Sequence, residues 1–262
     1  MELEKIRQAV LAAIAAIAPE TDLQQLQTDQ PLRRQIDLDS MDWLNVIAGL
    51  HERLSIEVPE RDYGRLTTLD AIVGYLASHP AAGAGVPAPQ PSTELPATRH
   101  WVNGMAVTIR PIRAEDLPLE VDFVRHLSTD TRYQRFMVTV AELPQTKLRY
   151  LTDVDQVRHV ALVATTEGDG RETIVGVVRY IVDPAGTSCE FAVALDDAWH
   201  GTGLAGILMH ELIGVARARG LRTMEGIVLA TNTTMLHFAH QLGFRSQRDP
   251  EERDTMRVVL AL

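Results

Sequence analysis

The spacing of apolar residues divides the chain into stretches of different character. In residues 1–78 apolar positions recur at steps of three and four, which is the spacing of one face of an α-helix. The helices predicted in this way contain Leu3, Ile6, Val10, Ile14 and Ile17, then Leu44, Ile47, Leu50 and Leu54, and finally Leu69, Ile72, Val73 and Leu76. The first stretch is therefore predicted to be a small, all-helical bundle.

A proline-rich segment follows the helical stretch. Residues 79–98 contain Pro80, Pro87, Pro89, Pro91 and Pro96 among alanine, glycine and serine, with almost nothing apolar to bury. Such a composition is typical of a linker, which in the polyproline II limit of ~3.1 Å per residue spans up to about 60 Å. We therefore expect two domains, residues 1–78 and residues 99–262.

The second stretch alternates between strand-like and helical patterns. Strands are predicted over 106–111, 159–165, 174–182, 188–195, 223–229 and 255–260, and helices over 115–126, 203–219 and 233–242. This alternation predicts an α/β or α+β domain of ordinary size.

Composition narrows the possible functions. The chain has 262 residues and a net charge of −10, which argues against non-specific binding to nucleic acid, since that binding depends on Lys and Arg. No apolar run reaches the ~18–20 residues of a membrane span, and the N-terminal residues lack the pattern of a secretory signal. With the single cysteine Cys189 no internal disulfide is possible, so we expect a cytoplasmic protein.

A serine stands where the second predicted helix begins, in the sequence DLDSMDW (37–43). Serine is a favoured N-terminal cap, and acidic neighbours suit the positive end of the helix dipole. The same helix end also tolerates a phosphate group on Ser40, because free backbone N–H groups point outward there. The motif taken alone leaves both interpretations open.

Residues 1–78 resemble an acyl carrier protein over essentially their whole length. They contain a long first helix, a loop, the Asp-Ser-Met version of the family's Asp-Ser-Leu motif at 39–41, and an acidic second helix. The resemblance implies a four-helix bundle with 4′-phosphopantetheine esterified to Ser40 by a phosphopantetheinyl transferase. It also implies an acidic face toward basic partner enzymes, for which a plain solvated helix face is the alternative; the residues concerned are Asp39, Asp42, Glu52 and Glu57. The first 80 residues hold 13 acidic and 7 basic side chains, which agrees with such a face.

A glycine turn follows the predicted strand 188–195. The residues HGTGLA (200–205) open an amphipathic helix. Glycines let a ligand approach the backbone, and the first N–H groups of a helix point at a bound pyrophosphate. A lone Gly-x-Gly is also common in ordinary tight turns. A dinucleotide fingerprint is rejected, because Gly206 stands one position out of place.

Residues 105–262 resemble the GNAT family of N-acetyltransferases, in which this turn is Gln/Arg-x-x-Gly-x-Gly/Ala and holds the pyrophosphate of acetyl-CoA. The sequences IRPIR (109–113) with Asp116, Asn232, and Leu242-Gly243-Phe244 strengthen the resemblance. It implies an α/β fold with a mixed central sheet. The donor-binding residues that it implies are Val193, Ala194, Leu195, His200, Gly201, Thr202, Gly203, Leu204, Ala205 and Asn232. His200 departs from the family's Gln or Arg.

The finer resemblance is to bacterial protein lysine acetyltransferases, and it rests on residues 128–136 and on the strand EFAV (190–193). In those enzymes a glutamate on this strand is the general base, which implies that role for Glu190. The alternative is a strand-edge carboxylate that pairs with an arginine. The tyrosine that many members use to protonate the leaving thiolate is replaced by Ala239. The thiolate then leaves unprotonated, or His240 assists. We interpret the pair His237 and His240 as surface residues, and expect no metal.

These features predict an N-acyltransferase fused to an acyl carrier, an acyltransferase that moves groups other than amino-acyl groups. The donor is acyl-CoA or a phosphopantetheine thioester, and the acceptor is a protein lysine or a small biosynthetic amine. The glycine turn favours free acyl-CoA, because a carrier-bound arm lacks the adenosine diphosphate. The alternative is a carrier or scaffold whose GNAT domain binds CoA without turnover.

Overall fold

The computed structural model describes residues 3–18, 21, 23–36, 40–54, 56, 58, 62, 65–78, 95–136, 143, 145–168, 170–183, 185–248 and 254–262. The chain divides into two compact units, which are described separately below. One contains the N-terminal helices together with Leu143–Tyr150, and the other contains the sheet. The sequence division had placed 143–150 within the second domain.

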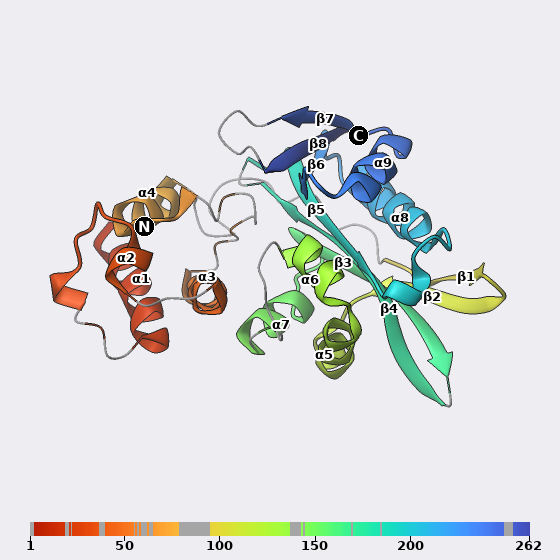
Figure 1. Ribbon diagram of the computed structural model, residues 1–262, viewed down its shortest axis with the longest axis horizontal. Helices are drawn as coiled ribbons and strands as arrows, with labels where there is room; N and C mark the ends of the chain where they lie inside the picture. The colour runs from red at the N-terminus through yellow and green to blue at the C-terminus, as the bar shows by residue number, and fades with distance from the viewer. Residues whose placement is uncertain are drawn as a thin grey trace. The chain divides into compact units, whose positions relative to one another are not determined.

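The first unit is a helical bundle. Its elements are α1 (Leu3–Ile17), the 3₁₀ turn η1 (Leu23–Gln25), the short α2 (Leu32–Gln35), α3 (Ser40–Leu54) and α4 (Leu69–Ser78) (Figure 1). Most of the apolar residues predicted to face inward do so, and Ile6, Val10, Ile14, Leu50 and Ile72 are all inaccessible to solvent, whereas Leu3 at the start of α1 is 62% exposed. At roughly 1.5–3 kcal/mol for each fully buried aliphatic side chain, this small core carries most of the favourable free energy of the bundle.

Asp70 fixes the start of α4 in the bundle. Its carboxylate accepts a hydrogen bond from Thr28 Oγ1 at 2.8 Å and lies 3.3 Å from Arg7 Nη2, while its backbone N–H donates to Thr28 O at 2.9 Å. An acidic residue also suits the positive end of the helix dipole. The first turn of α4 is thereby held against α1 and against the segment that contains Thr28.

The second unit is built on one mixed sheet in the order β1-β2-β3-β4-β5-β6-β8-β7 (Figure 1). The strands are β1 (Thr98–Val102), β2 (Met105–Pro111), β3 (His159–Gly168), β4 (Arg171–Val182), β5 (Ser188–Leu195), β6 (Thr223–Leu229), β7 (Arg245–Arg248) and β8 (Thr255–Ala261). β5 and β6 are parallel, and the other neighbouring pairs are antiparallel. The expected mixed central sheet is confirmed.

Helices cover both faces of the sheet. The helices of this unit are α5 (Leu117–His126), α6 (Thr129–Phe136), α8 (Leu204–Ala218) and α9 (Thr233–Gln241), and α7 (Gln145–Thr152) spans the division between the units. Neighbouring residues of β4 show which helix lies on which face: Arg179 contacts Glu120 of α5, whereas Tyr180 contacts Arg219 at the end of α8. α6 lies beside α5, and α9 packs with α8 (Figure 1).

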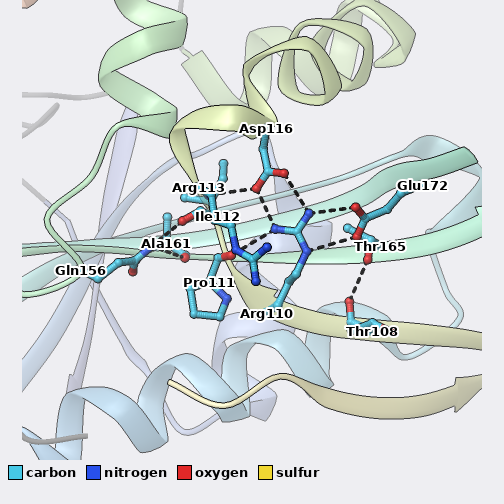
Figure 2. Close-up of polar contacts among 10 residues, drawn as sticks. All are labelled: Thr108, Arg110, Pro111, Ile112, Arg113, Asp116, Gln156, Ala161, Thr165 and Glu172. Atoms are coloured by element: carbon cyan, nitrogen blue, oxygen red, sulfur yellow. Dashed lines mark hydrogen bonds and ion pairs between the residues drawn. The ribbon is translucent and has the colours of Figure 1, made fainter. Parts of the chain in front are cut away.

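Arg110 fastens the start of α5 to the sheet (Figure 2). Its guanidinium donates to both carboxylate oxygens of Asp116, at 2.7 and 2.9 Å, and to Glu172 at 3.1 Å. Burial alone raises the pKa of Asp116, but the hydrogen bonds from Arg110 and from the Arg113 N–H outweigh it and hold that pKa below its ordinary value. The IRPIR motif therefore has a structural role here.

Four helices and strands from Thr98 onward escaped the pattern analysis. β1 begins at Thr98, which the sequence division had assigned to the linker, and β7 has the sequence RSQR with all four residues exposed. α6 (TDTRYQRF) is strongly polar, and α7 also lacks a continuous apolar face in its sequence QTKLRYLT. None of these segments shows the apolar periodicity on which the predictions depended.

Candidate active site

β5 and β6 separate along their length. They pair only at Ser188, Cys189 and Glu190, whose β6 partners are Thr223, Met224 and Glu225. Beyond this point β5 continues to pair with β4, and β6 continues to pair with β8. Main-chain groups of 191–195 that would face β6 in a continuous sheet therefore border a gap between the strands, which we call the strand opening.

A phenylalanine lies where the strands separate. The ring of Phe191 packs so closely on β6 that a Cβ atom added to Gly226 would stand 2.7 Å from Phe191 Cε1. On its other side this ring lies 4.9 Å, between centroids, from the ring of Phe244. Glycine at 226 is thus required for the close approach of a bulky side chain. The packed ring of Phe191 fills the space where the strands separate, on the sheet face covered by α8 and α9.

The glycine turn lies at the end of β5. The 3₁₀ turn η4 (Asp197–Trp199) leads into His200, and α8 begins at Leu204. Gly201 and Gly203 have φ values of 72° and 88°, in the left-handed region that side chains disfavour. Cβ atoms added at Gly201, Gly203 or Gly206 would meet nothing within 4 Å.

This geometry fits a pyrophosphate. Open space borders the turn, and the first N–H groups of α8 have no partners within an α-helix and lie at its positive end. Thr202 supports the turn, since its hydroxyl donates to Trp199 O at 2.8 Å and accepts from the Leu204 N–H at 3.3 Å. The His200 N–H donates to Asp197 O at 3.2 Å. The predicted donor residues 193–195 and 200–205 are thus joined by Asp196 and η4.

Glu190 occupies the last position at which β5 pairs with β6. It is the register partner of Ile181 on β4, so its side chain lies on the same face as that of Arg179, which is the α5 face. Its partner on β6 is Glu225, which is buried and binds Arg257 of β8 through Nε and Nη2. Two glutamates therefore occupy neighbouring positions where the strands separate.

Buried polar groups continue this face beneath α5. Arg179 donates to Leu151 O at 2.9 Å, lies 3.3 Å from His159 Nε2 and forms an ion pair with Glu120 at 3.4 Å. Burial raises the pKa of Glu120, against the opposing effect of the positive charge on Arg179. The face that carries Glu190 is therefore much more polar than the apolar face under α8.

Asn232 lies just beyond β6. Its side-chain oxygen accepts from the Met235 N–H at 2.9 Å and caps α9, while its amide group donates to Gln134 Oε1 of α6 at 3.1 Å.

Ala239 is fully buried within α9, and His237 and His240 on the same helix are exposed. The part of the chain that the structure describes contains no group of three His, Cys, Asp or Glu side chains that could hold a metal ion.

Ser40 is the first residue of α3. A helix N-terminus is favourable for a phosphate ester, as argued above. Asp39 and Glu57 lie outside the described residues, and the structure describes no side chain for Ser40, Asp42 or Glu52. The expected acidic face is therefore still a prediction.

A groove of about 760 Å³ follows the outer face of α8. It is lined by Leu95, Pro96, His100 and one side of α8 from Gly203 to Arg219. Its lining shares Gly203 with the glycine turn, but Glu190 is not part of it.

Among the described helices, none has the length and apolar character needed to cross a membrane.

Comparison with known proteins identifies the families of both parts of the chain. The model of the acetyltransferase (GNAT) family matches residues 122–244, and the model of the phosphopantetheine attachment site matches residues 8–76. Acetyltransferase PA5475 of Pseudomonas aeruginosa is 38% identical over 167 residues, which are 62% of this chain and 90% of that protein. An acyl carrier protein of Streptomyces coelicolor is 33% identical over 72 residues, 28% of this chain and 78% of that protein.

The fold agrees with a solved structure. The GNAT domain of S. lividans PAT superposes with a TM-score of 0.58 at 26% identity, covering 63% of this chain and 97% of that domain. An open strand pair beside a glycine turn thus defines an acyltransferase of GNAT type. The chain belongs to the GNAT acetyltransferase family and carries an acyl carrier domain with a phosphopantetheine attachment site at its N-terminal side.

Proposed function

We propose that this chain is an N-acyltransferase that moves an acetyl or other acyl group from acyl-CoA to an amine. The observation that supports this most is the strand opening, which lies between Glu190 and the glycine turn. A donor bound there has its pyrophosphate at the turn 200–205 and its pantetheine arm beside 193–195. The reacting thioester then lies near Glu190.

The chemistry follows from these positions. The amine nitrogen attacks the thioester carbonyl carbon, a C–N bond forms, the C–S bond breaks, and the thiolate leaves. The attacking amine must lose a proton, which Glu190 accepts directly or through water. Main-chain N–H groups of Val193 to Leu195 are suited to stabilise the negative charge on the carbonyl oxygen. Since a free thiol has a pKa near 8.5, its thiolate leaves at modest cost without an acid at Ala239.

The donor is proposed to be free acyl-CoA. A thioester on the carrier ends in a serine phosphate ester and lacks the adenosine diphosphate for which the turn provides space.

Phosphopantetheine, attached to Ser40 by a phosphopantetheinyl transferase, supplies a thiol that holds an acyl group as a thioester. The carrier domain then presents the acceptor amine, receives the acyl chain or recruits the enzyme. A small biosynthetic amine fits a fused carrier better than a protein lysine, and we propose a cytoplasmic location.

Glu190→Gln tests the enzymatic proposal. Loss of a general base is expected to lower kcat by about 100- to 10,000-fold, with the Kd for CoA unchanged, because the glutamine keeps the shape of the strand. The measurement is thiol release from acetyl-CoA with a panel of amines, beside calorimetric titration of CoA. If neither protein transfers an acyl group but both bind CoA, the protein is a CoA-binding scaffold.

The carrier proposal is tested by intact mass. The full chain is co-expressed with a phosphopantetheinyl transferase, and Ser40→Ala serves as the control. A mass gain of one phosphopantetheine that is absent from the control supports attachment at Ser40. An unchanged mass would reduce residues 1–78 to an interaction domain beside a CoA-dependent transferase.

A further inference from the structure

α6 is connected to both sides of the strand opening. It lies beside α5, on the sheet face toward which Glu190 points, and it packs against β5 (Figure 1). Its sequence TDTRYQRF gives it no apolar face that would fix its position by burial alone. Specific hydrogen bonds to neighbouring elements therefore have an unusually large part in placing this helix.

The first connection is to Asp197, the second residue after β5. One carboxylate oxygen accepts from the Ser128 N–H at 2.8 Å, and the other accepts from Thr131 Oγ1 at 2.7 Å. Ser128 Oγ lies 2.9 Å from Asp197 Oδ1 and 3.0 Å from Thr131 Oγ1, and its one proton serves one of these at a time. Ser128 also caps α6 by accepting from the Thr131 N–H at 3.1 Å. One carboxylate thus fixes the first turn of α6.

The second connection is to Asn232, the third residue after β6. Its amide group donates to Gln134, one turn further along α6, while its oxygen caps α9. The two strands that separate are therefore joined again through α6.

Asp197 also leads toward the turn 200–205, which holds the donor in the proposed function, without being one of its residues. It opens η4, whose last residue Trp199 is buried and accepts the Thr202 hydroxyl at 2.8 Å. Thr202 lies between Gly201 and Gly203. A short series of bonds thus leads from α6 through Asp197 and Trp199 to the glycine turn.

We propose that Asp197 is a positioning residue that couples the donor turn to α6, so that binding of CoA stabilises α6 over the sheet face that carries Glu190. This inference rests on the proposed function, because it takes the strand opening as the donor site. A donor that contacts both β5 and the turn restrains the two segments to which α6 is tied. The helix then loses part of its freedom to open, and its backbone amides exchange more slowly.

Hydrogen exchange of the full-length chain tests this coupling, with CoA as the probe. In the wild type, saturating CoA is expected to slow exchange in the peptide 128–136 by about fivefold or more. Asp197→Asn keeps the size of the side chain but loses its charge and one acceptor. In this variant we expect less than about twofold slowing, while the Kd for CoA stays within about threefold.

Asp196→Asn is the matched control. Asp196 is the neighbouring carboxylate, but its described bond is to the Ala198 N–H, at 2.9 Å, within its own turn. The control should retain the wild-type slowing. Should Asp197→Asn fold poorly, Thr131→Val serves in its place, because it removes one of the bonds to Asp197 without altering the turn. In Thr131→Val, the slowing of exchange by CoA should lie between that of the wild type and the twofold limit expected for Asp197→Asn.

The outcomes separate the two proposals. Equal slowing in Asp197→Asn and in the wild type would overturn the coupling, as would a wild type that binds CoA with no change at 128–136. In both cases the proposed function stands. A wild type that binds no CoA would overturn the proposed function and the coupling with it.

Discussion

The two edges of β5 behave differently. Along one edge the strand pairs with β4 at seven consecutive positions, from Cys189 to Leu195. Along the other it pairs with β6 at three positions and then stops. The same eight residues therefore complete a rigid sheet on one side and leave main-chain groups for a ligand on the other. A binding site of this kind is made by omitting strand pairing, and it depends on how the two strands are held apart.

The largest effect on stability is expected from a substitution in the closed half of the sheet, by which we mean β1 to β5, where neighbouring strands pair without a gap. Asp116→Ala removes the buried bidentate partner of Arg110 and should lower the free energy of unfolding of the sheet unit by about 3–5 kcal/mol. The measurement is calorimetry of the transition that CoA shifts upward. Glu115→Ala, an exposed neighbour, is the control. A lower affinity of folded Asp116→Ala for CoA would show that the closed half also shapes the opening.

Gly203→Ala is expected to act mainly on donor binding. A left-handed φ of 88° costs a side chain about 1–2 kcal/mol, and any shift of the turn displaces the first N–H groups of α8. We expect the Kd for CoA to rise by about tenfold in a calorimetric titration. Gly214→Ala, in the middle of α8 with open space for a methyl group, should leave that Kd unchanged. Equal affinity in the two variants would contradict the assignment of the turn.

Gly226→Ala addresses the position where the strands separate. The added methyl group meets the Phe191 ring at 2.7 Å, so overpacking should lower the free energy of unfolding by about 1–3 kcal/mol. Phe191→Leu in the same chain removes the clash and should restore part of the loss, as measured by the melting temperature. If Gly226→Ala melts like the wild type, the ring moves freely and does not hold the strands apart.

The smallest effect is a dependence of stability on pH through Asp197. Burial raises its pKa, but the hydrogen bonds from Ser128 and Thr131 outweigh this and set the pKa below the ordinary value of 3.8. A lowered pKa in the folded state means that the contribution to stability is present above pH 3.8 and is lost as pH falls through the native pKa. Melting temperatures of wild type and Asp197→Asn should therefore differ at pH 7 and converge well below pH 4. A constant difference would show that the charge of Asp197 is not involved.

Sequence reasoning succeeded where one continuous segment carries the information. The strand 188–195, the turn 200–205 and the helix after it follow one another, so apolar pattern and glycine placement were sufficient to predict them. The contact between Asp197 and Ser128 spans 69 residues and joins two polar segments, so no local pattern indicates it. The neighbouring carboxylate Glu225 was missed because strand register brings it beside Glu190.

The short strand β7 has a consequence for the behaviour of the protein in solution. It forms one border of the sheet, and both Arg245 and Arg248 lie on it, exposed to solvent in the sequence RSQR. Border strands present unpaired backbone groups onto which another chain can add, and short, charged strands discourage that addition. The opposite border, β1, carries Trp101 with 74% of its surface exposed. At high protein concentration, edge-to-edge association is therefore expected to begin at β1 rather than at β7.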